Sequence, residues 1–257
     1  MNSRLQRLKV QEENTIKQRK LNTRMARLIV ALALLCASLI GMGGVIMTIK
    51  PKDKPAPAEE DSVKDTPKAA EIPEKDKWKL ILVNKDNPVP RDFTVDLIAF
   101  GNSRVDYRIK DELSNMIEAA GKDGIVLNVC SGYRSVSEQK ELYDKRVLSY
   151  IAQGYSEEAG KIYANQYIQP PGASEHHTGL AVDFITDGSS KLDESFAQTE
   201  AYKWLKENAE KYGFIERYPK DKIDITGVAW EPWHFRYVGV EYAKTINSMG
   251  ICLEEYV

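Results

Sequence analysis

The stretch that decides the fold lies at residues 174–184 and reads Ser-Glu-His-His-Thr-Gly-Leu-Ala-Val-Asp-Phe. Toward its end, apolar residues recur at every second position, which is the period of a β-strand with one face on a hydrophobic core. These apolar residues are Leu180, Val182 and Phe184. Asp183 therefore points to the opposite face, where the small Ala181 leaves room beside it.

A second stretch, residues 231–237, follows the same pattern and reads Glu-Pro-Trp-His-Phe-Arg-Tyr. Its aromatic residues alternate with His234 and Arg236, so we expect a strand with His234 on the polar face. Pro232 excludes a regular helix. Glu231 is therefore expected on a turn that leads into this strand.

Every histidine of the chain lies in these two stretches: His176, His177 and His234. The Pro-Pro-Gly at 170–172 makes the approach to the first strand irregular, so His176 can curl back over the face that carries Asp183. Two imidazoles and one carboxylate suit zinc, and three protein ligands leave one position open, as in catalytic zinc sites. We predict that His176, Asp183 and His234 bind Zn²⁺, with Glu231 near the water activated there.

Each motif alone also has an ordinary structural explanation. A histidine and an aspartate seven residues apart often serve packing or an ion pair, and a Glu-x-x-His pair is equally unspecific. The confinement of all histidines to two strand-like stretches favours the metal. His177 alternates away from His176, and we expect it to make a structural hydrogen bond.

A cationic residue, Arg134, lies in the sequence Ser-Gly-Tyr-Arg-Ser at 131–135. It stands between the end of a strand-like segment and the start of a helix, a place where anions bind. We expect it to stabilise negative charge on a substrate, with Gln139 adding a polar contact. The structural alternative is a salt bridge beside the helix.

The rest of the chain from 78 to 257 mixes helices and short strands. Helix-like patterns end at glycine or proline signals, and a Ser-x-x-Glu capping box begins the segment at 135. We expect helices at 110–120, 135–154, 157–167 and 199–212, and strands at 125–130, 180–184 and 233–237. The predicted fold class is α+β, with a small antiparallel sheet that carries the zinc site and is flanked by helices.

The charge of the chain is distributed unevenly. Residues 1–27 carry eight Lys and Arg against two Glu, whereas the remainder carries 28 Lys and Arg against 36 Asp and Glu. An acidic body argues against nucleic acid as a partner, because phosphate contacts need clustered basic residues.

The uncharged run at 28–49 contains 22 residues. That length suffices for a transmembrane helix, since about 20 apolar residues cross a bilayer. The basic segment 1–27 is then cytoplasmic and the C-terminal domain extracytoplasmic, in a single-pass protein of the cell membrane. A cleaved signal peptide is the alternative, but its apolar region usually has only about 7–15 residues. Residues 50–77, rich in Pro, Lys and Glu, read as a disordered tether.

Two cysteines fall inside the predicted domain, Cys130 and Cys252. A disulfide between them is compatible with an extracytoplasmic location. We favour two free, buried thiols, because a domain of this size does not need a covalent staple. We expect the protein to be a monomer.

These motifs together resemble the signature of VanY-type D-alanyl-D-alanine carboxypeptidases, the zinc D,D- and L,D-carboxypeptidases of peptidoglycan. The resemblance covers residues 79–245 and includes Ser-x-His-x-x-Gly-x-Ala-x-Asp at 174–183, Glu-x-x-His at 231–234 and Ser-Gly-Tyr-Arg-Ser at 131–135. It implies a zinc site made by His176, Asp183 and His234. It also implies Glu231 as catalytic base.

The same resemblance implies that Arg134 polarises the scissile carbonyl and that Tyr133, Gln139 and Ser174 line the peptide site. The expected activity is removal of the C-terminal D-Ala from peptidoglycan stem pentapeptides. An L,D-carboxypeptidase acting on stem tetrapeptides and a non-catalytic, zinc-containing wall-binding module are the alternatives. A module that only binds has no need of a base at Glu231.

Overall fold

The computed structural model describes residues 72–187 and 191–257. The predicted basic segment 1–27 and transmembrane helix 28–49 lie outside the described residues, as does the predicted tether up to residue 71. Within the two described ranges, no helix is both long and apolar enough to cross a membrane.

Four short strands form the central sheet, and all neighbouring pairs are antiparallel, in the order β3-β4-β6-β5. Their bounds are Asn128–Ser131 for β3, Ala181–Ile185 for β4, Phe214–Glu216 for β5 and His234–Tyr237 for β6. The predicted α+β class with a small antiparallel sheet is confirmed. The sequence pattern did not predict β5.

The two faces of the sheet differ as the alternation predicted. Val182 and Phe184 of β4 and Phe235 of β6 belong to the main hydrophobic core. Asp183 and His234 lie on the other face, directly opposite each other in the β4–β6 register. The main core is completed by apolar side chains of two helices, α2 and α5 (Lys110–Lys122 and Glu200–Asn208).

Of the remaining helices in the described ranges, one has 17 residues and the others have ten or fewer. They are α3 Val136–Ala152, α4 Glu157–Ala164, α6 Ile223–Thr226, α7 Val240–Met249 and α8 Leu253–Tyr256, with 3₁₀ turns at Glu74–Asp76, Tyr107–Ile109, Glu175–Thr178, Glu194–Gln198, Ala209–Tyr212 and Lys220–Lys222. The predicted capping box at Ser135 and Glu138 is present. Helix α2 runs past Gly121, where an end was predicted, because Gly124 rather than Gly121 adopts the left-handed conformation, with φ of 77°.

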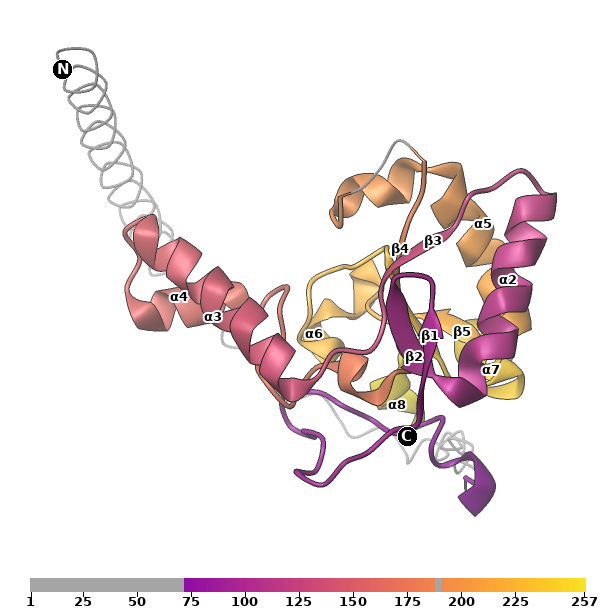
Figure 1. Ribbon diagram of the computed structural model, residues 1–257, viewed down its shortest axis with the longest axis horizontal. Helices are drawn as coiled ribbons and strands as arrows, with labels where there is room; N and C mark the ends of the chain where they lie inside the picture. Colours follow the sequence, from indigo (N-terminus) through magenta and orange to yellow (C-terminus); the bar gives the residue numbers. More distant parts are fainter. Residues whose placement is uncertain (1–71, 188–190) are drawn as a thin grey trace, which may run out of the picture. The chain divides into compact units, whose positions relative to one another are not determined.

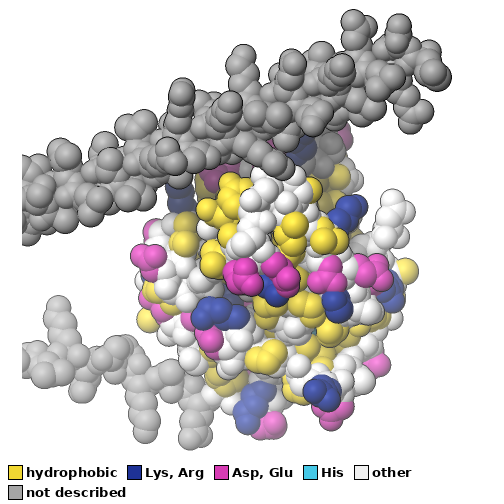
Figure 2. Space-filling model, turned by 90° about the vertical axis from the view of Figure 1, so that its left-hand side faces the viewer, with side chains coloured by type: hydrophobic (Ala, Val, Ile, Leu, Met, Phe, Trp, Pro, Cys, Tyr) yellow, Lys and Arg dark blue, Asp and Glu magenta, His cyan; other side chains and the backbone are white. Residues whose placement is uncertain are grey.

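Helices α3 and α4 form a paired arm that projects away from the sheet (Figure 1). Gly160 allows the close approach, because a Cβ there would lie 3.3 Å from the carbonyl oxygen of Val147. Tyr150, Tyr155 and Tyr163 form a small aromatic cluster between the two helices. Apolar side chains remain at the surface of this arm, among them Leu148 and Ile162, which are 62% and 64% exposed. Figure 2 shows apolar and charged side chains intermixed on this side of the molecule.

A two-stranded hairpin, β1 Leu97–Phe100 and β2 Ser103–Asp106, was not predicted. Its second strand packs against the loops that precede helix α3 and strand β4. A Cβ on Gly132 would overlap the carbonyl oxygen of Arg104, and one on Gly179, at φ of 68°, would lie 2.7 Å from the Asp106 nitrogen. Both positions therefore require glycine.

The described part of the domain begins before the predicted start at residue 78. Ile72 packs against a second hydrophobic cluster that includes Val238 and Leu253. Cys130 and Cys252 are both free, as favoured from the sequence. The expected burial of Cys130 is wrong, because its strand, β3, forms an edge of the sheet and leaves the residue exposed.

Candidate active site

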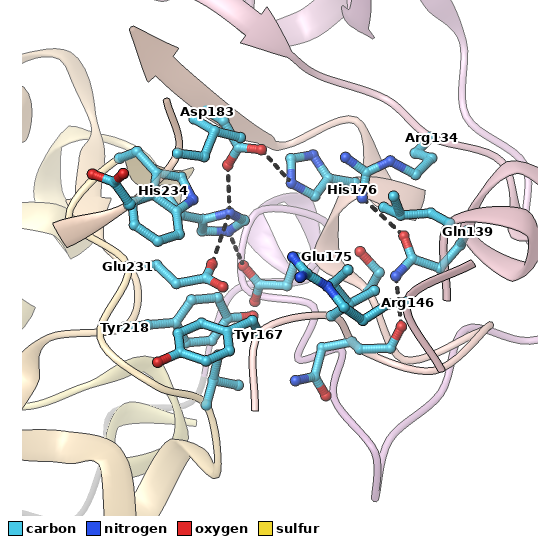
Figure 3. A pocket seen from close by; sticks show the side chains of 18 of the residues that line it. Arg134, Gln139, Arg146, Tyr167, Glu175, His176, Asp183, Tyr218, Glu231 and His234 are labelled. Atoms are coloured by element: carbon cyan, nitrogen blue, oxygen red, sulfur yellow. Dashed lines mark hydrogen bonds and ion pairs between the residues drawn. The ribbon is translucent and has the colours of Figure 1, made fainter. Parts of the chain in front are cut away.

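Three side chains from two strands and one 3₁₀ turn meet on the open face of the sheet. Asp183 on β4 and His234 on β6 are cross-strand neighbours, and His176 comes from the turn Glu175–Thr178 before β4. One ligand atom of each residue lies within 4.8 Å of the others, and all three residues are buried. The structure therefore brings together the three residues predicted to bind the metal (Figure 3).

The Asp183 carboxylate bridges the two imidazoles. Its Oδ2 lies 3.2 Å from His176 Nε2, and its Oδ1 lies 2.9 Å from His234 Nδ1. Burial would raise the pKa of Asp183, but the neighbouring histidines outweigh it and hold the pKa well below its usual range. This carboxylate therefore stays ionised, which is the state that a metal ligand needs.

The two imidazoles differ in what their second ring nitrogen contacts. His176 Nδ1 lies 2.7 Å from the carbonyl oxygen of Gly132, so it donates there and leaves Nε2 free to bind a cation. His234 Nε2 is buried and has no hydrogen-bond partner in the described residues. The nearest acceptor is Glu175 Oε2, at 3.8 Å, which is also buried without a partner.

These observations fit a zinc ion. Two orphaned polar atoms, His234 Nε2 and Glu175 Oε2, face each other across 3.8 Å, so a carboxylate stands behind this imidazole. A carboxylate behind a metal-binding histidine is the common outer-shell arrangement at zinc sites. The donor set of two nitrogens and one oxygen is one that zinc accepts.

Glu175 is held by two buried arginines. Its Oε1 accepts hydrogen bonds from Arg217 Nε and Arg236 Nη1, each at 2.7 Å. Burial would raise the pKa of Glu175, but the two guanidinium groups outweigh it and keep the pKa well below its ordinary value. Glu254 on α8 completes the network by accepting two further hydrogen bonds from Arg217.

Glu231 lies on the turn before β6, as predicted, and the backbone nitrogen of His234 donates to its carbonyl oxygen. Its carboxylate Oε2 is 3.8 Å from His234 Nδ1. Only 6% of the residue is exposed, and burial raises the pKa of its carboxyl to about 8. Glu231 is thus a buried carboxyl group beside the three ligands, and it lies outside the group whose ligand atoms are all within 4.8 Å of one another.

Arg134 lies at the same pocket and has no carboxylate partner within ion-pair distance in the described residues. Its Nη1 donates to Gln139 Oε1 at 2.9 Å, and its Nη2 donates to Ser131 Oγ at 2.8 Å. Gln139 in turn donates to the carbonyl oxygen of Gln169. The guanidinium is therefore oriented by neutral groups and keeps its charge available for a substrate.

The other predicted residues separate into two groups. Ser174 is buried and lines the pocket with Arg134 and Gln139. Tyr133 is not among the residues that line it, and its ring packs under the guanidinium of Arg104. The geometry therefore gives no support to a substrate contact from Tyr133.

His177 makes the structural hydrogen bonds expected of it. Its Nε2 accepts from the backbone nitrogen of Gly172 at 3.1 Å, so its Nδ1 donates to the carbonyl oxygen of Arg134 at 2.7 Å. Burial lowers its pKa, which favours this neutral form.

The pocket has a volume of about 740 Å³ and is lined by residues from distant parts of the chain. Sequence reasoning missed Tyr218, Glu175 and the arginines behind it. Tyr218 lines the pocket, and its ring centroid lies 4.9 Å from that of His234. Arg236 lies two residues after His234 on β6, so its side chain is on the same face. That alternation was the one sequence signal that could have indicated it. Arg217 and Tyr218 follow a strand too short to show a pattern.

Comparisons with known proteins agree with this geometry. Residues 102–240 match the VanY family, described as D-alanyl-D-alanine carboxypeptidase. A D-alanyl-D-alanine carboxypeptidase of Enterococcus faecalis is 45% identical over 190 residues, which is 74% of this chain and 69% of that protein.

Two solved structures extend the comparison. A variant of the vancomycin resistance D,D-pentapeptidase VanY from a VanB-type cassette, in complex with Zn(II), has a TM-score of 0.64 and 46% identity, covering 70% of this chain and 98% of the other. The LdcB LD-carboxypeptidase has a TM-score of 0.60 and 39% identity, covering 68% and 83%. On the strength of these matches and of the site described above, the chain belongs to the VanY family of D-alanyl-D-alanine carboxypeptidases.

Proposed function

We propose that this protein is a zinc-dependent D,D-carboxypeptidase that removes the C-terminal D-Ala from the pentapeptide stems of peptidoglycan. The observation that carries the proposal is the convergence of His176, Asp183 and His234 within 4.8 Å, with the carboxyl group of Glu231 beside them. The relatives support the substrate, because they include a D,D-pentapeptidase crystallised with Zn(II).

The three ligands would hold the ion, and Glu231 would move the proton. A zinc ion bound there supplies Lewis acidity, which lowers the pKa of water from 15.7 to about 7 and polarises a carbonyl group. The pKa of Glu231, which burial raises to about 8, would fall beside a bound cation. Its carboxylate would then accept the proton of the attacking water and deliver it to the nitrogen of the departing D-Ala.

Arg134 would stabilise the charge that develops on the carbonyl oxygen. Its guanidinium is already oriented by Ser131 and Gln139, so it need not reorganise during the reaction. Because neither partner is a carboxylate, a developing anion does not compete with an existing ion pair.

The stereochemistry of the residue before the cut distinguishes the main proposal from its alternative. LdcB, an LD-carboxypeptidase, is also similar to this chain, so L,D-activity on tetrapeptide stems is the second candidate. Incubation of the zinc-loaded protein with defined pentapeptide and tetrapeptide stems, followed by product mass, separates the two. We expect loss of one alanine from the pentapeptide and an intact tetrapeptide, and shortening of the tetrapeptide alone would reverse the assignment.

A non-catalytic wall-binding module would bind both stems and shorten neither. The Glu231→Gln variant provides the control for any observed turnover, since contaminating peptidase activity would survive that change. Loss of turnover with retained zinc assigns the hydrolysis to this pocket.

We further propose that residues 28–49 anchor the protein in the cell membrane, with residues 1–27 in the cytoplasm and the catalytic domain outside as a monomer. The uncharged run and its basic flank support this orientation. Protease added to intact cells or spheroplasts should degrade the catalytic domain and spare a tag at the N-terminus. Degradation of the tag instead would reverse the orientation.

A further inference from the structure

The pocket extends along helix α3, away from the three ligand side chains. Residues of this helix that line the pocket are three or four positions apart, so they share one helix face. They are Gln139, Leu142, Arg146 and Tyr150. Gln139 accepts the hydrogen bond of Arg134 and so marks the end near the reacting bond. Figure 3 shows Arg146 and Gln139 on the wall opposite Glu231 and Tyr218.

The length of this face can be compared with that of a peptide. At a rise of about 1.5 Å per residue, the helix advances about 10 Å from Gln139 to Arg146. An extended peptide rises about 3.3 Å per residue, so the same distance corresponds to about three substrate residues.

The direction in which the substrate runs follows from the reaction. A carboxypeptidase of this kind releases a single C-terminal residue, so only a small space is needed on the leaving-group side of the cut. The α3 face can therefore be filled only by the part of the stem that precedes the cut. Arg146 then lies beside the third residue before the scissile bond.

Arg146 is chemically suited to an anion. In residues 72–187 and 191–257, no carboxylate lies within ion-pair distance of its guanidinium, whereas Lys140 on the same helix is paired with Asp144. Arginine binds carboxylates through paired N–H donors. In a peptidoglycan stem, the third residue before the terminal D-Ala is a γ-linked D-glutamate, whose α-carboxylate is free unless it is amidated.

We propose that Arg146 forms a subsite for this α-carboxylate, so that the enzyme distinguishes stems with a free carboxylate from amidated stems. The inference rests on the proposed function and specifies which part of the stem the α3 face contacts. Because exposed ion pairs contribute little, the preference should be about two- to fivefold and should appear in KM rather than kcat.

The test uses the zinc-loaded full chain with three peptides. They are a pentapeptide stem with a free D-glutamate α-carboxylate, the same stem amidated there, and a short acyl-D-Ala-D-Ala peptide that lacks the glutamate. The R146Q variant should raise KM for the free-carboxylate stem to that of the amidated stem. Its kinetics on the other two peptides should match those of the wild type, and R146K should retain part of the preference.

Lys145→Gln is the matched control, because it removes the same charge from the adjacent position, which does not line the pocket. Equal KM values for the two stems in the wild type, or equal effects of the Arg146 and Lys145 variants, would overturn the subsite. Calorimetric binding of the two tetrapeptide products gives the same comparison without turnover. The short peptide tests the proposed function separately, since its hydrolysis does not require the subsite.

Discussion

The two walls of the pocket are built by different kinds of structure. The ligand wall lies on a four-stranded sheet, and each of its reactive side chains is held by register or by a buried hydrogen bond. The opposite wall is the first helix of the projecting α3–α4 arm, whose apolar side chains are partly at the surface. The chemistry is thus expected to depend on the sheet, and substrate preference on the arm.

This difference is also one of stability. The ligand wall includes a buried network of Glu175, Arg217 and Arg236, in which loss of one partner leaves a buried charge uncompensated. The arm is stabilised by a tyrosine cluster and one close helix contact. Changes in the sheet should therefore alter metal binding or turnover, whereas changes in the arm beyond Gln139, which contacts Arg134, should leave both in place.

Metal removal is expected to give the largest effect, because all three residues of the ligand wall hold the same ion. A chelator should abolish hydrolysis and lower the thermal midpoint of the domain, and added zinc should restore both, since an ion that binds only the folded state stabilises it. Activity assays and calorimetric melts with and without the chelator measure this. Hydrolysis that continues at full rate after the zinc content has fallen to zero would contradict the assigned site.

The Glu231→Gln substitution is expected to give the next largest effect. We expect turnover to fall by about 10²–10⁴-fold, because the proton acceptor is lost, while zinc content stays unchanged. Stem hydrolysis and metal analysis on the same preparation check both parts. Glu194→Gln is the matched control, since Glu194 also lines the pocket but lies outside the ligand cluster. If the Glu231 variant keeps a tenth of the wild-type activity, Glu231 is not the proton acceptor.

The Glu175→Gln substitution should lower zinc affinity although Glu175 is not one of the three ligands. We expect zinc affinity to fall about 10- to 100-fold, because the acceptor nearest to His234 Nε2 loses its charge. Competition with a calibrated chelator measures this, and Glu175→Asp should recover part of the loss.

The control for this change is Glu216→Gln. Glu216 is also a largely buried acid, and it accepts hydrogen bonds from Tyr202, Trp230 and Lys206 outside the ligand cluster. Its replacement should destabilise the domain to a comparable degree while zinc affinity stays the same. If both variants lose zinc equally, the effect of Glu175 is one of general stability.

The arm gives the smallest effect. Tyr163→Ala removes an edge-to-face contact with Tyr155, whose ring centroid lies 4.9 Å away. Such a pair contributes about 0.5–1.5 kcal/mol beyond its buried area. Hydrogen exchange in α4 should accelerate, with zinc affinity and hydrolysis of a short acyl-D-Ala-D-Ala peptide within twofold of the wild type. A large loss of zinc would mean that the arm supports the ligand wall.

The sequence predicted the two helices of the arm and the three ligand residues, the latter for a physical reason. Strand alternation has a period of two, so His234 and Asp183 could be assigned to one face from their neighbours alone. The cross-strand pairing that brings them together is long-range, yet both strands had to bury their aromatic or aliphatic faces in one core.

Other features left no local pattern. Strand β5 is only three residues long, and the β1–β2 hairpin pairs residues that show no strict alternation. The role of Glu175 depends on Arg217 and Arg236, which are distant in sequence from it and meet it only in the folded chain. The packing of the Tyr133 ring against Arg104, outside the lining of the pocket, likewise depends on a side-chain direction that the motif does not encode.

Gly132 and Gly179 allow the backbone of strand β2 to approach the two loops around the site. The Arg104 carbonyl oxygen accepts from the Tyr133 nitrogen, and the Asp106 nitrogen donates to the Gly179 carbonyl oxygen, so one strand is joined by its main chain to both loops around the site. The separation of those loops is thus set by the thickness of a polypeptide backbone. The spacing around the catalytic centre therefore depends on the main chain of this strand.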